Sequence, residues 1–358
     1  MALRVEVARG RDALTELLLF RDRALAGRPA RWPTLLPLDL PLLLGESPFS
    51  MERRFHPLVA RNRGEIVARA VATIDGAYQR FWDERLGHVL FFDALPGTRE
   101  AVRALMNEAC EWLAAAGAVA ARVGMGLFDM PLVIDAYEAL PPTILRENPP
   151  HYHALLKDAG FETERGFADY RIAVDADLVA RWERMVAAGR RRGYRLVPFG
   201  DVPAAERAVL VADLLNDAFR AHFGYVPTTP AEQALIGRMF EATGYLETSF
   251  FAYEGDRVVG QVYVVPETSA MAAVRPGWVV PEEERLNFLG IGVRAAARGR
   301  GVNLALAAAS YLALVRRGAT HLSYTLVLDD NWPSRRTAEK LGAAVCASYV
   351  CYRRSFPR

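Results

Sequence analysis

The feature of this sequence that most constrains its fold is a loose internal repeat, in which the same order of elements is predicted twice. Residues 55–74 are predicted to form a strand, a turn at Gly64 and a second strand. Residues 250–265 show the same pattern around Gly255. A chain that repeats a unit on this scale is expected to fold as two domains of similar architecture.

The similarity between the halves continues after each hairpin. An apolar strand is predicted at residues 89–92 in the first half and at residues 286–293 in the second, and a long helical pattern follows each of them. Residues 148–160 and 331–342 each predict a short helix that an asparagine opens and a glycine closes. Apolar, strand-like runs end the two halves, at residues 168–174 and 345–352.

The alternation of strands and helices in both halves indicates an α/β (α+β) fold rather than a β-sandwich or a helical bundle. We expect each half to contain a mixed, twisted sheet flanked by helices. A basic connecting stretch with Arg181 and Arg190 lies between the halves. The boundary is therefore placed so that residues 1–178 form the first domain and residues 179–358 the second.

Composition and charge exclude several classes of protein. The chain has 358 residues, of which 52% are hydrophobic and 24% charged, and its formal net charge is +2. This balance argues against a strongly basic nucleic-acid-binding protein, so no nucleic-acid partner is expected. Cys110, Cys346 and Cys351 form no C-x-x-C pair. They are expected to be buried free thiols rather than parts of a disulfide framework or a metal site.

The first residues and the apolar runs of the sequence indicate where in the cell the protein is expected. Residues 1–12 carry charges too early for a secretory signal peptide. No window approaches the roughly 20 consecutive apolar residues that a membrane-spanning helix needs. We therefore expect a soluble, cytoplasmic protein without a membrane partner, whose oligomeric state the sequence leaves open.

The segment with the clearest chemistry is an arginine- and glycine-rich loop, Arg298–Gly301. It lies between a predicted strand, residues 285–293, and a predicted helix, residues 302–317. Unpaired backbone N–H groups and the positive end of the helix dipole favour an anion at such a helix N-terminus. The glycines permit positive φ, and the arginines add positive charge. The pattern favours a pyrophosphate-binding loop, with a solvated turn as the alternative.

Two motifs in this half resemble those of the GNAT superfamily of acyl-CoA-dependent N-acyltransferases. Val293 ends the predicted strand, and Arg298-Gly-Arg-Gly-Val-Asn303 then follows the family pattern Arg/Gln-x-x-Gly-x-Gly/Ala. Farther on, Asn331, Ser334 and the run Glu339-Lys-Leu-Gly342 match the second family motif. The resemblance covers the second half well and the first half only as a degenerate copy. It implies two GNAT-like domains in tandem.

The resemblance also implies which residues bind an acyl-CoA, either acetyl-CoA or a longer one. Backbone groups of residues 291–293 would hold the pantetheine arm and the acyl group, and the 298–303 loop would hold the pyrophosphate. Asn331 and Ser334 would contact the arm from the far side. The implied cofactor-binding residues are Ile291, Gly292, Val293, Arg298, Gly299, Arg300, Gly301, Val302, Asn303, Asn331 and Ser334.

The reaction that this resemblance implies is direct attack of an amine on the thioester, without a covalent enzyme intermediate. The acceptor would be a small-molecule or peptide amine. A strand N–H near Val293 would stabilise the oxyanion, and Asn287 and Tyr324 complete the predicted catalytic set. Residues 222–232 combine aromatic and polar side chains and are expected to face the acceptor. A plain helix connection capped by Thr229 is the alternative.

Three positions depart from the family pattern. Asn303 stands where the pyrophosphate motif prefers Gly or Ala, Ala338 where many members carry a tyrosine acid, and Asn287 where some carry a glutamate base. An amine near neutral pH must still lose a proton during the reaction. The candidates for the proton transfers are Glu267, Glu284, Asp329, His222 and Tyr324.

The first half lacks the pyrophosphate motif, because only Pro96-Gly-Thr98 follows its strand at residues 89–92. We therefore expect this half to have lost CoA binding. Its expected role is to shape the acceptor site or to support the other domain.

Three other interpretations remain open. Gly290-Ile-Gly-Val-Arg-Ala295 matches a dinucleotide-binding pattern, but the acidic candidate Asp329 lies about twice as far away as the usual spacing of roughly 20 residues. A GNAT-like fold that takes aminoacyl-tRNA as donor is a second interpretation, against which the near-neutral charge and the intact loop argue. The unmatched acid and base positions favour a third, a non-catalytic CoA- or partner-binding protein.

Overall fold

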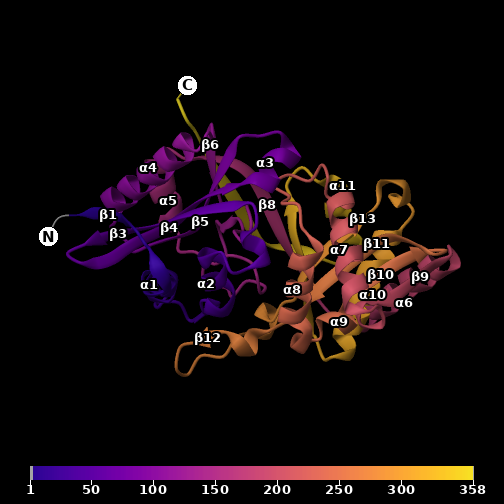
Figure 1. The fold of residues 1–358 in the computed structure, drawn as a ribbon. Coiled ribbons are helices and arrows are strands. Elements are labelled where there is room, and N and C mark those ends of the chain that lie inside the picture. The colour runs from indigo at the N-terminus through magenta and orange to yellow at the C-terminus, as the bar shows by residue number, and fades with distance from the viewer. Residues whose placement is uncertain (1–2, 358) are drawn as a thin grey trace.

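Two sheets form the centre of the structure, a computed structural model that describes residues 3–357 (Figure 1). The larger sheet has nine strands and the smaller has four. In spatial order, the larger sheet contains β1 (Arg4–Val7), β3 (Arg53–Asn62), β4 (Glu65–Asp75), β5 (Leu86–Ala94), β6 (Ala120–Val123), β15 (Ala344–Ser355), β8 (Glu162–Ala173) and β14 (His321–Leu328), with β7 (Leu132–Val133) paired to β15. The smaller sheet contains β13 (Phe288–Val293), β11 (Arg257–Val265), β10 (Phe250–Glu254) and β9 (Tyr194–Pro198).

The remaining elements are helices and one short strand pair that joins the halves. Strand β2 (Ala30–Arg31) pairs with β12 (Ala273–Val274). The α-helices are α1 (Gly10–Ala24), α2 (Leu36–Leu44), α3 (Gly76–Trp82), α4 (Arg99–Ala115), α5 (His151–Asp158), α6 (Ala176–Arg191), α7 (Ala204–Ala218), α8 (Pro230–Phe240), α9 (Tyr245–Thr248), α10 (Val302–Arg316) and α11 (Trp332–Lys340). The 3-10 turns are η1 (Pro48–Ser50), η2 (Phe199–Asp201), η3 (Glu241–Thr243), η4 (Ser269–Met271), η5 (Glu282–Glu284) and η6 (Ala295–Ala297).

The two halves exchange their last strands. Strand β8 ends the first half, yet it lies between β15 and β14 of the second half. Strand β15 ends the chain and pairs antiparallel with β6 of the first half. In Figure 1 the yellow C-terminal segment accordingly ends beside the purple strands. The larger sheet therefore contains strands of both halves, whereas the smaller sheet is built from the second half alone.

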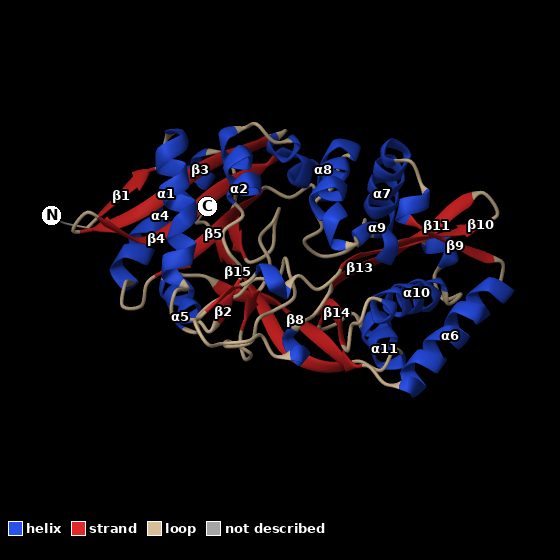
Figure 2. Ribbon diagram, turned by 90° about the horizontal axis from the view of Figure 1, so that it is seen from below, coloured by secondary structure: helices blue, strands red, loops and turns tan. Residues whose placement is uncertain are grey.

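Helices cover both faces of the smaller sheet (Figure 2). On one face α10 and α6 pack together through Trp182 and Tyr311, two fully buried side chains whose ring centroids are 5.3 Å apart. On the other face, α7 and α9 cover a cluster around Phe199 and Phe251, which stack at 4.3 Å. Truncation of a buried aromatic residue of this kind to Ala costs about 3–5 kcal/mol of stability.

The structure confirms the α/β architecture and most of the predicted elements. The helix at 331–342 is confirmed, because the Asn331 side chain accepts from the N–H of Ser334 and Gly342 ends it at φ 92°. The same prediction for Asn148 is wrong. The Asn148 amide instead bonds to both backbone groups of Val133, at 2.8 and 3.1 Å, and α5 begins only at His151.

Three further features concern predictions about the whole chain. Residues 178 and 179 lie in the first turn of α6, so the chosen boundary falls within a helix and stays a prediction. Cys110 and Cys351 are buried free thiols, and Cys346 is partly buried. Within residues 3–357, none of the helices combines the length and the apolar character needed to cross a bilayer.

Candidate functional site

Strands β13 and β14 are neighbours that side chains, rather than a backbone ladder, hold together. The Asn287 amide accepts from the Ser323 N–H at 2.9 Å and donates to the Ser323 carbonyl at 3.2 Å. Two residues later the Leu289 N–H donates to the Thr325 hydroxyl at 3.0 Å. In the part of the chain that the structure describes, β13 has a ladder only with β11. Its other edge, residues 290–293, is therefore not paired with a strand.

A buried carboxyl group stands behind this junction. Asp169, from β8 of the first half, accepts from the Ser323 hydroxyl at 3.1 Å and from the Leu326 N–H at 3.4 Å. Its side chain is 1% exposed, and burial raises the pKa of Asp169 to about 7. The register of β14 slips beside it, where Leu326 has φ 40°. Sequence reasoning missed Asp169, because only the strand exchange brings it to β14.

The predicted pyrophosphate loop has the geometry of an anion site. Gly299 and Gly301 have φ of 74° and 81°, and Gly301 begins α10 without any side-chain cap. The first N–H groups of α10 are therefore not satisfied by a capping side chain. Arg298 stabilises the loop by donating to the carbonyls of Val293 (3.1 Å) and Ala218 (2.7 Å). Arg300 forms an ion pair with Glu254.

The second motif lies on the side of α11 that faces β14. The Ser334 N–H donates to the Asn331 side chain, which caps the helix. The Ser334 hydroxyl shares a 3.1 Å hydrogen bond with the Tyr324 hydroxyl. Burial raises the pKa of Tyr324 to about 12, so its phenol keeps its proton near neutral pH. Asn303, the departure from the loop motif, donates to the Thr337 hydroxyl at 2.8 Å. This residue thus joins α10 to α11 at the end of the loop.

The predicted acceptor-facing segment, residues 222–232, packs on the end of β13. The rings of Phe219 and Tyr225 stack at 5.6 Å. A Cβ atom on Gly292 would lie 3.0 Å from the Ala218 Cβ and 3.1 Å from the Phe219 ring, so the glycine allows this close approach. The Asn216 side chain holds the segment through the Tyr225 hydroxyl (2.7 Å).

Side chains of the first half hold this segment in place. Trp82 donates from its indole to the Tyr225 carbonyl at 2.9 Å. The guanidinium groups of Arg122 and Arg165 lie over the Phe223 ring, at 4.6 and 5.4 Å. This contact supports the expectation that the first half shapes the site of the second.

The segment continues into α8, and a residue of the first half contacts the N-terminal cap of that helix. Thr229 is the N-cap of α8, as the alternative interpretation of this segment expected, in a capping box with Glu232. Arg53 of β3 forms a buried 2.7 Å ion pair with Glu232. Loss of one partner of a buried pair is strongly destabilising, so this contact fixes α8 against β3.

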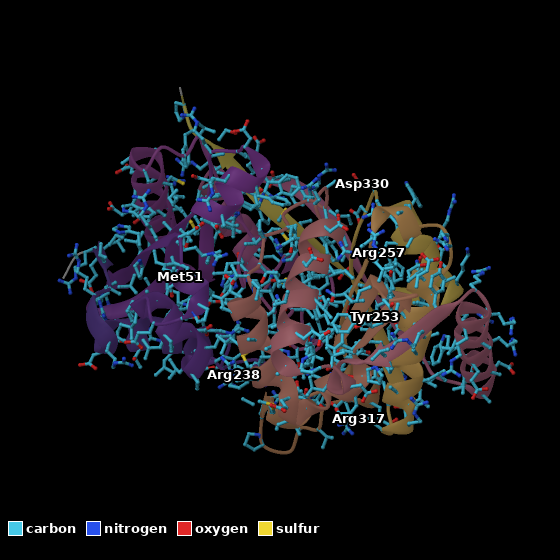
Figure 3. The ribbon with its side chains drawn as sticks, turned by 45° about the vertical axis from the view of Figure 1, so that its right-hand side comes forward. Met51, Arg238, Tyr253, Arg257, Arg317 and Asp330 are labelled. Atoms are coloured by element: carbon cyan, nitrogen blue, oxygen red, sulfur yellow. The ribbon has the colours of Figure 1, made fainter. Side chains whose placement is uncertain are left out.

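His222 is the proton-transfer candidate that lies in the segment packed beside β13. Its ring packs on Phe219 at 5.3 Å, and its Nδ1 lies 3.2 Å from the Phe223 carbonyl. Because a carbonyl only accepts, Nδ1 carries the proton and Nε2 keeps a lone pair. Burial lowers the pKa of His222, against smaller opposing effects of that carbonyl and of the Asp330 carboxylate. Asp330 itself is exposed after β14 (Figure 3).

The other proton-transfer candidates have different surroundings. Glu284 accepts from the Leu140 N–H of the first half at 3.0 Å, and Glu267 accepts from Ser269. Asp329 is exposed after β14, and its carboxylate packs so tightly on Gly166 that any larger residue there would collide with it. Tyr324 thus lies on β14 and Asp329 directly after it, His222 lies in the segment beside β13, and Glu267 and Glu284 lie in the connection between β11 and β13.

The equivalent strand edge of the first half is occupied by the chain itself. Arg146, which is 7% exposed, donates to the Phe92 carbonyl of β5 and forms a 2.6 Å ion pair with Asp129. Strand β5 also has a parallel ladder with β6 from Leu86 to Val89. These contacts occupy the edge of β5 that faces β6, which supports the expectation that the first half does not bind CoA.

The dinucleotide-binding interpretation is wrong. Gly290 and Gly292 lie inside strand β13 and not in a turn before a helix. Their lack of side chains serves packing instead, because Tyr263 covers Gly290 and Phe219 covers Gly292. No pyrophosphate turn is therefore present at this motif.

Comparison with known proteins agrees with this geometry. Residues 211–343 match the family described as Acetyltransferase (GNAT) family. A curated relative, the bacterial ceramide synthase of Caulobacter vibrioides (strain NA1000 / CB15N), is 20% identical over 332 residues, which is 86% of this chain and 86% of that protein.

Solved structures show the same fold over the whole chain. A tandem GNAT protein from the clavulanic acid biosynthesis pathway has a TM-score of 0.58 at 16% identity, covering 99% of both chains. A GCN5-related N-acetyltransferase from Sphaerobacter thermophilus has a TM-score of 0.53 at 17% identity, covering 99% of this chain and 95% of that one. The predicted GNAT domain is therefore confirmed over residues 211–343, and the fold of the whole chain is that of a tandem GNAT protein.

Proposed function

Because residues 211–343 form a GNAT domain, we propose that this protein is an acyl-CoA-dependent N-acyltransferase that transfers an acetyl group, or a longer acyl group, directly to an amine. One observation carries the proposal. The unpaired edge of β13 leads, one loop later, to the uncapped N-terminus of α10. The first can bind an extended chain through backbone hydrogen bonds, and the second can bind a pyrophosphate.

The residues of this chain divide the binding of the donor between them. Backbone groups of residues 291–293 hold the pantetheine arm and the acyl group. N–H groups of residues 299–303 hold the pyrophosphate, and Arg298 fixes their geometry through its two carbonyl partners. Asn331 and Ser334, at the start of α11, flank the arm from the other side.

The proton transfers are assigned to side chains around the same edge. His222 accepts the proton of the attacking amine on Nε2, because Nδ1 is already committed to the Phe223 carbonyl. A strand N–H near Val293 stabilises the oxyanion. Tyr324, still protonated at neutral pH, donates a hydrogen bond to the leaving sulfur. Asn287 acts as a positioning residue, since its amide holds β13 against β14.

The test is calorimetric titration of the full chain with acetyl-CoA, CoA, NADH and ATP, followed by a screen of amines. We expect one saturable site for acetyl-CoA and CoA and none for NADH. The relative named a ceramide synthase supports adding long-chain acyl-CoAs to the donor series. Absence of acyl-CoA binding would refute the proposal and favour a tRNA-linked donor or a partner-binding role.

A double variant tests the loop directly. Arg298→Glu with Gly301→Asp should weaken acetyl-CoA binding by at least about 100-fold, because it adds negative charge where the pyrophosphate lies and disturbs a residue at φ 81°. Arg275→Glu with Gly277→Asp is the matched control, since Gly277 also has positive φ (79°) but lies beside β12. Unchanged affinity in the first variant, with circular dichroism showing a folded chain, would remove the pyrophosphate assignment.

A further inference from the structure

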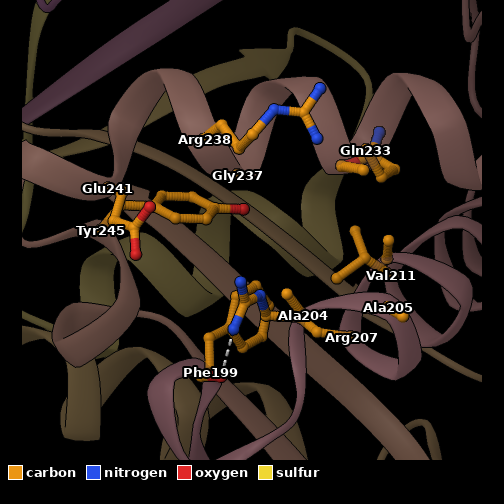
Figure 4. Close-up of a pocket in the computed structure, with 12 residues that line it drawn as sticks. Phe199, Ala204, Ala205, Arg207, Val211, Gln233, Gly237, Arg238, Glu241 and Tyr245 are labelled. Carbon is orange, nitrogen blue, oxygen red and sulfur yellow. Dashed lines mark hydrogen bonds between the residues drawn. The ribbon is translucent and has the colours of Figure 1, made fainter.

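A pocket lies between α7 and α8, away from the proposed transfer site (Figure 4). Its volume is about 320 Å³, and residues 204–211 of α7, residues 233–238 of α8 and Glu241 of η3 contribute to its walls. The transfer site uses the opposite end of α7, where Ala218 accepts from Arg298. Residues 208 and 218 are roughly 15 Å apart along a helix that rises 1.5 Å per residue. The pocket is therefore separate from the acyl-transfer site.

The inner wall of this pocket is apolar. Phe199, Val211 and Tyr245 line it, and each is at most 3% exposed. The rings of Phe199 and Tyr245 meet edge to face at 5.8 Å. Such a wall favours the apolar body of a ligand rather than a fully hydrated ion.

Polar groups with unused hydrogen-bonding capacity converge on the same space. Arg207 is held by the carbonyls of Phe199 and Val202, both at 3.0 Å, through one nitrogen only. Within residues 3–357 the Arg238 guanidinium makes no ion pair, and the Tyr245 hydroxyl has no hydrogen-bond partner. Figure 4 shows this hydroxyl directed between Arg238 on one side and Arg207 on the other.

The charge balance of the pocket is positive. Its two arginines face a single carboxylate, Glu241. Burial raises the pKa of Tyr245 above its usual range, so the hydroxyl remains a donor at neutral pH. Two guanidinium groups and a phenol hydroxyl together match one carboxylate, which accepts several hydrogen bonds.

A glycine in the interior of α8 keeps the pocket open. Gly237 is buried, and a Cβ atom placed on it would meet no atom within 4 Å. A glycine inside a helix costs about 1 kcal/mol relative to alanine. Neither a neighbouring atom nor a positive φ requires a glycine at this position. The empty space beside it is the pocket itself.

We propose that this pocket binds a small carboxylate with an apolar body, seated on Phe199, Val211 and Tyr245, with its carboxylate between Arg207 and Arg238. The volume is at the lower end of the range of about 300–1,000 Å³ found for small-molecule sites. The ligand class is thus a short fatty or aromatic acid. This proposal is independent of the acyl-transfer assignment, because no residue is shared.

The test uses hexanoate and benzoate as probes, with hexanol and benzyl alcohol as neutral comparators. Ligand-observed NMR on the full chain should give saturable binding of the acids, and the alcohols should bind at least about 10-fold more weakly because they lack the charge. Equal binding of acids and alcohols, or no binding of either acid, would overturn the proposal.

Variants then locate the site. Gly237→Leu should abolish hexanoate binding by filling the pocket, while thermal stability stays equal or rises, because leucine is the better helix former. Arg238→Gln should weaken binding by at least about 10-fold. Arg184→Gln, on the exposed face of α6, is the matched control and should bind as the natural protein does. Undiminished binding in Gly237→Leu would refute the location. Acetyl-CoA affinity should be unchanged in all three variants.

Discussion

Single residues around β13 and β14 differ in how much of their hydrogen-bonding capacity is already used. Both ends of the Asn287 amide bond to Ser323, and Arg298 uses its guanidinium on two carbonyls. Both residues therefore hold the backbone of the site in place, because their side chains bond to backbone groups of the protein itself. His222 differs, because only its Nδ1 has a partner while the ring remains partly exposed. A lone pair on Nε2 is the acceptor that the chemistry needs.

The assignment of His222 predicts a pH dependence at the residue scale. Burial lowers the pKa of His222, so the neutral, proton-accepting form is present above a pH that lies below the usual value of 6.5. The rate at low amine concentration should rise through that pKa as pH increases. His222→Gln should remove this limb and lower the plateau by about 100-fold or more.

The control for this prediction is binding of the donor. Acetyl-CoA affinity of His222→Gln should stay within about twofold, since no donor-binding residue is changed. A pH profile identical to that of the natural protein would assign the proton transfer to another group.

At the scale of elements, the strands and helices of the site are joined by side chains at their ends. Strand β14 slips register beside Asp169, and that carboxyl supplies acceptors for the Ser323 hydroxyl and the Leu326 N–H. Helix α10 is open at its N-terminus and tied to α11 by Asn303. The separation of β13 and β14 is therefore maintained by specific side-chain hydrogen bonds between the two strands.

The buried Asp169 predicts a pH-dependent stability. Its pKa is about 7 in the folded chain against 3.8 as the ordinary value, so the folded state binds the proton more tightly. Stability should therefore fall as pH rises from about 4 to about 7. Asp169→Asn should lose this dependence and be more stable than the natural chain above pH 7, by roughly 2–4 kcal/mol.

Urea denaturation at several pH values measures this difference. Cys110→Ala, a change at another buried group that stays protonated over the same range, provides the comparison because burial raises its pKa to about 11. A pH dependence that is the same in Asp169→Asn and in the natural chain would exclude Asp169 as its source.

At the scale of the whole molecule, each half completes the other. Strands β8 and β15 cross between the halves, and β2 pairs with β12. In the first half, Arg146 occupies the edge of β5, and Trp82 and the two arginines over Phe223 hold residues 222–232 of the second half. The contribution of the first half to the proposed reaction is thus to position a loop that belongs to the other half.

This arrangement predicts an effect across the halves. Trp82→Phe removes the indole hydrogen bond to the Tyr225 carbonyl. The specificity constant for the amine should fall about 2- to 10-fold, the value of one hydrogen bond, while acetyl-CoA affinity is unchanged. Trp112→Phe, on α4 where the ring stacks on His56, is the matched control. Equal loss in both variants would indicate a general effect on stability rather than on the loop.

Local sequence patterns determined many of the elements, because the signals involved are short-range. The strand–turn–strand hairpins, the Asn331 and Thr229 caps and the glycine-rich loop before α10 each depend on residues a few positions apart. The motif spacing also predicted the GNAT domain that the family comparison finds at residues 211–343. Asn148 resembled a cap in the same way, but β7 offered its amide two backbone groups at once.

Only the tertiary structure decided the strand exchange, the proximity of Asp169 to β14 and the contacts of the first half with residues 222–232. The pairing of β15 with β6 joins residues that lie more than half the chain apart, and strand partners at that distance leave no local pattern. The pocket between α7 and α8 also depends on the tertiary structure, because Arg207, Arg238 and Tyr245 come from three separate helices. Local preferences fix what each segment becomes, whereas burial of its apolar face against a distant partner fixes where it lies.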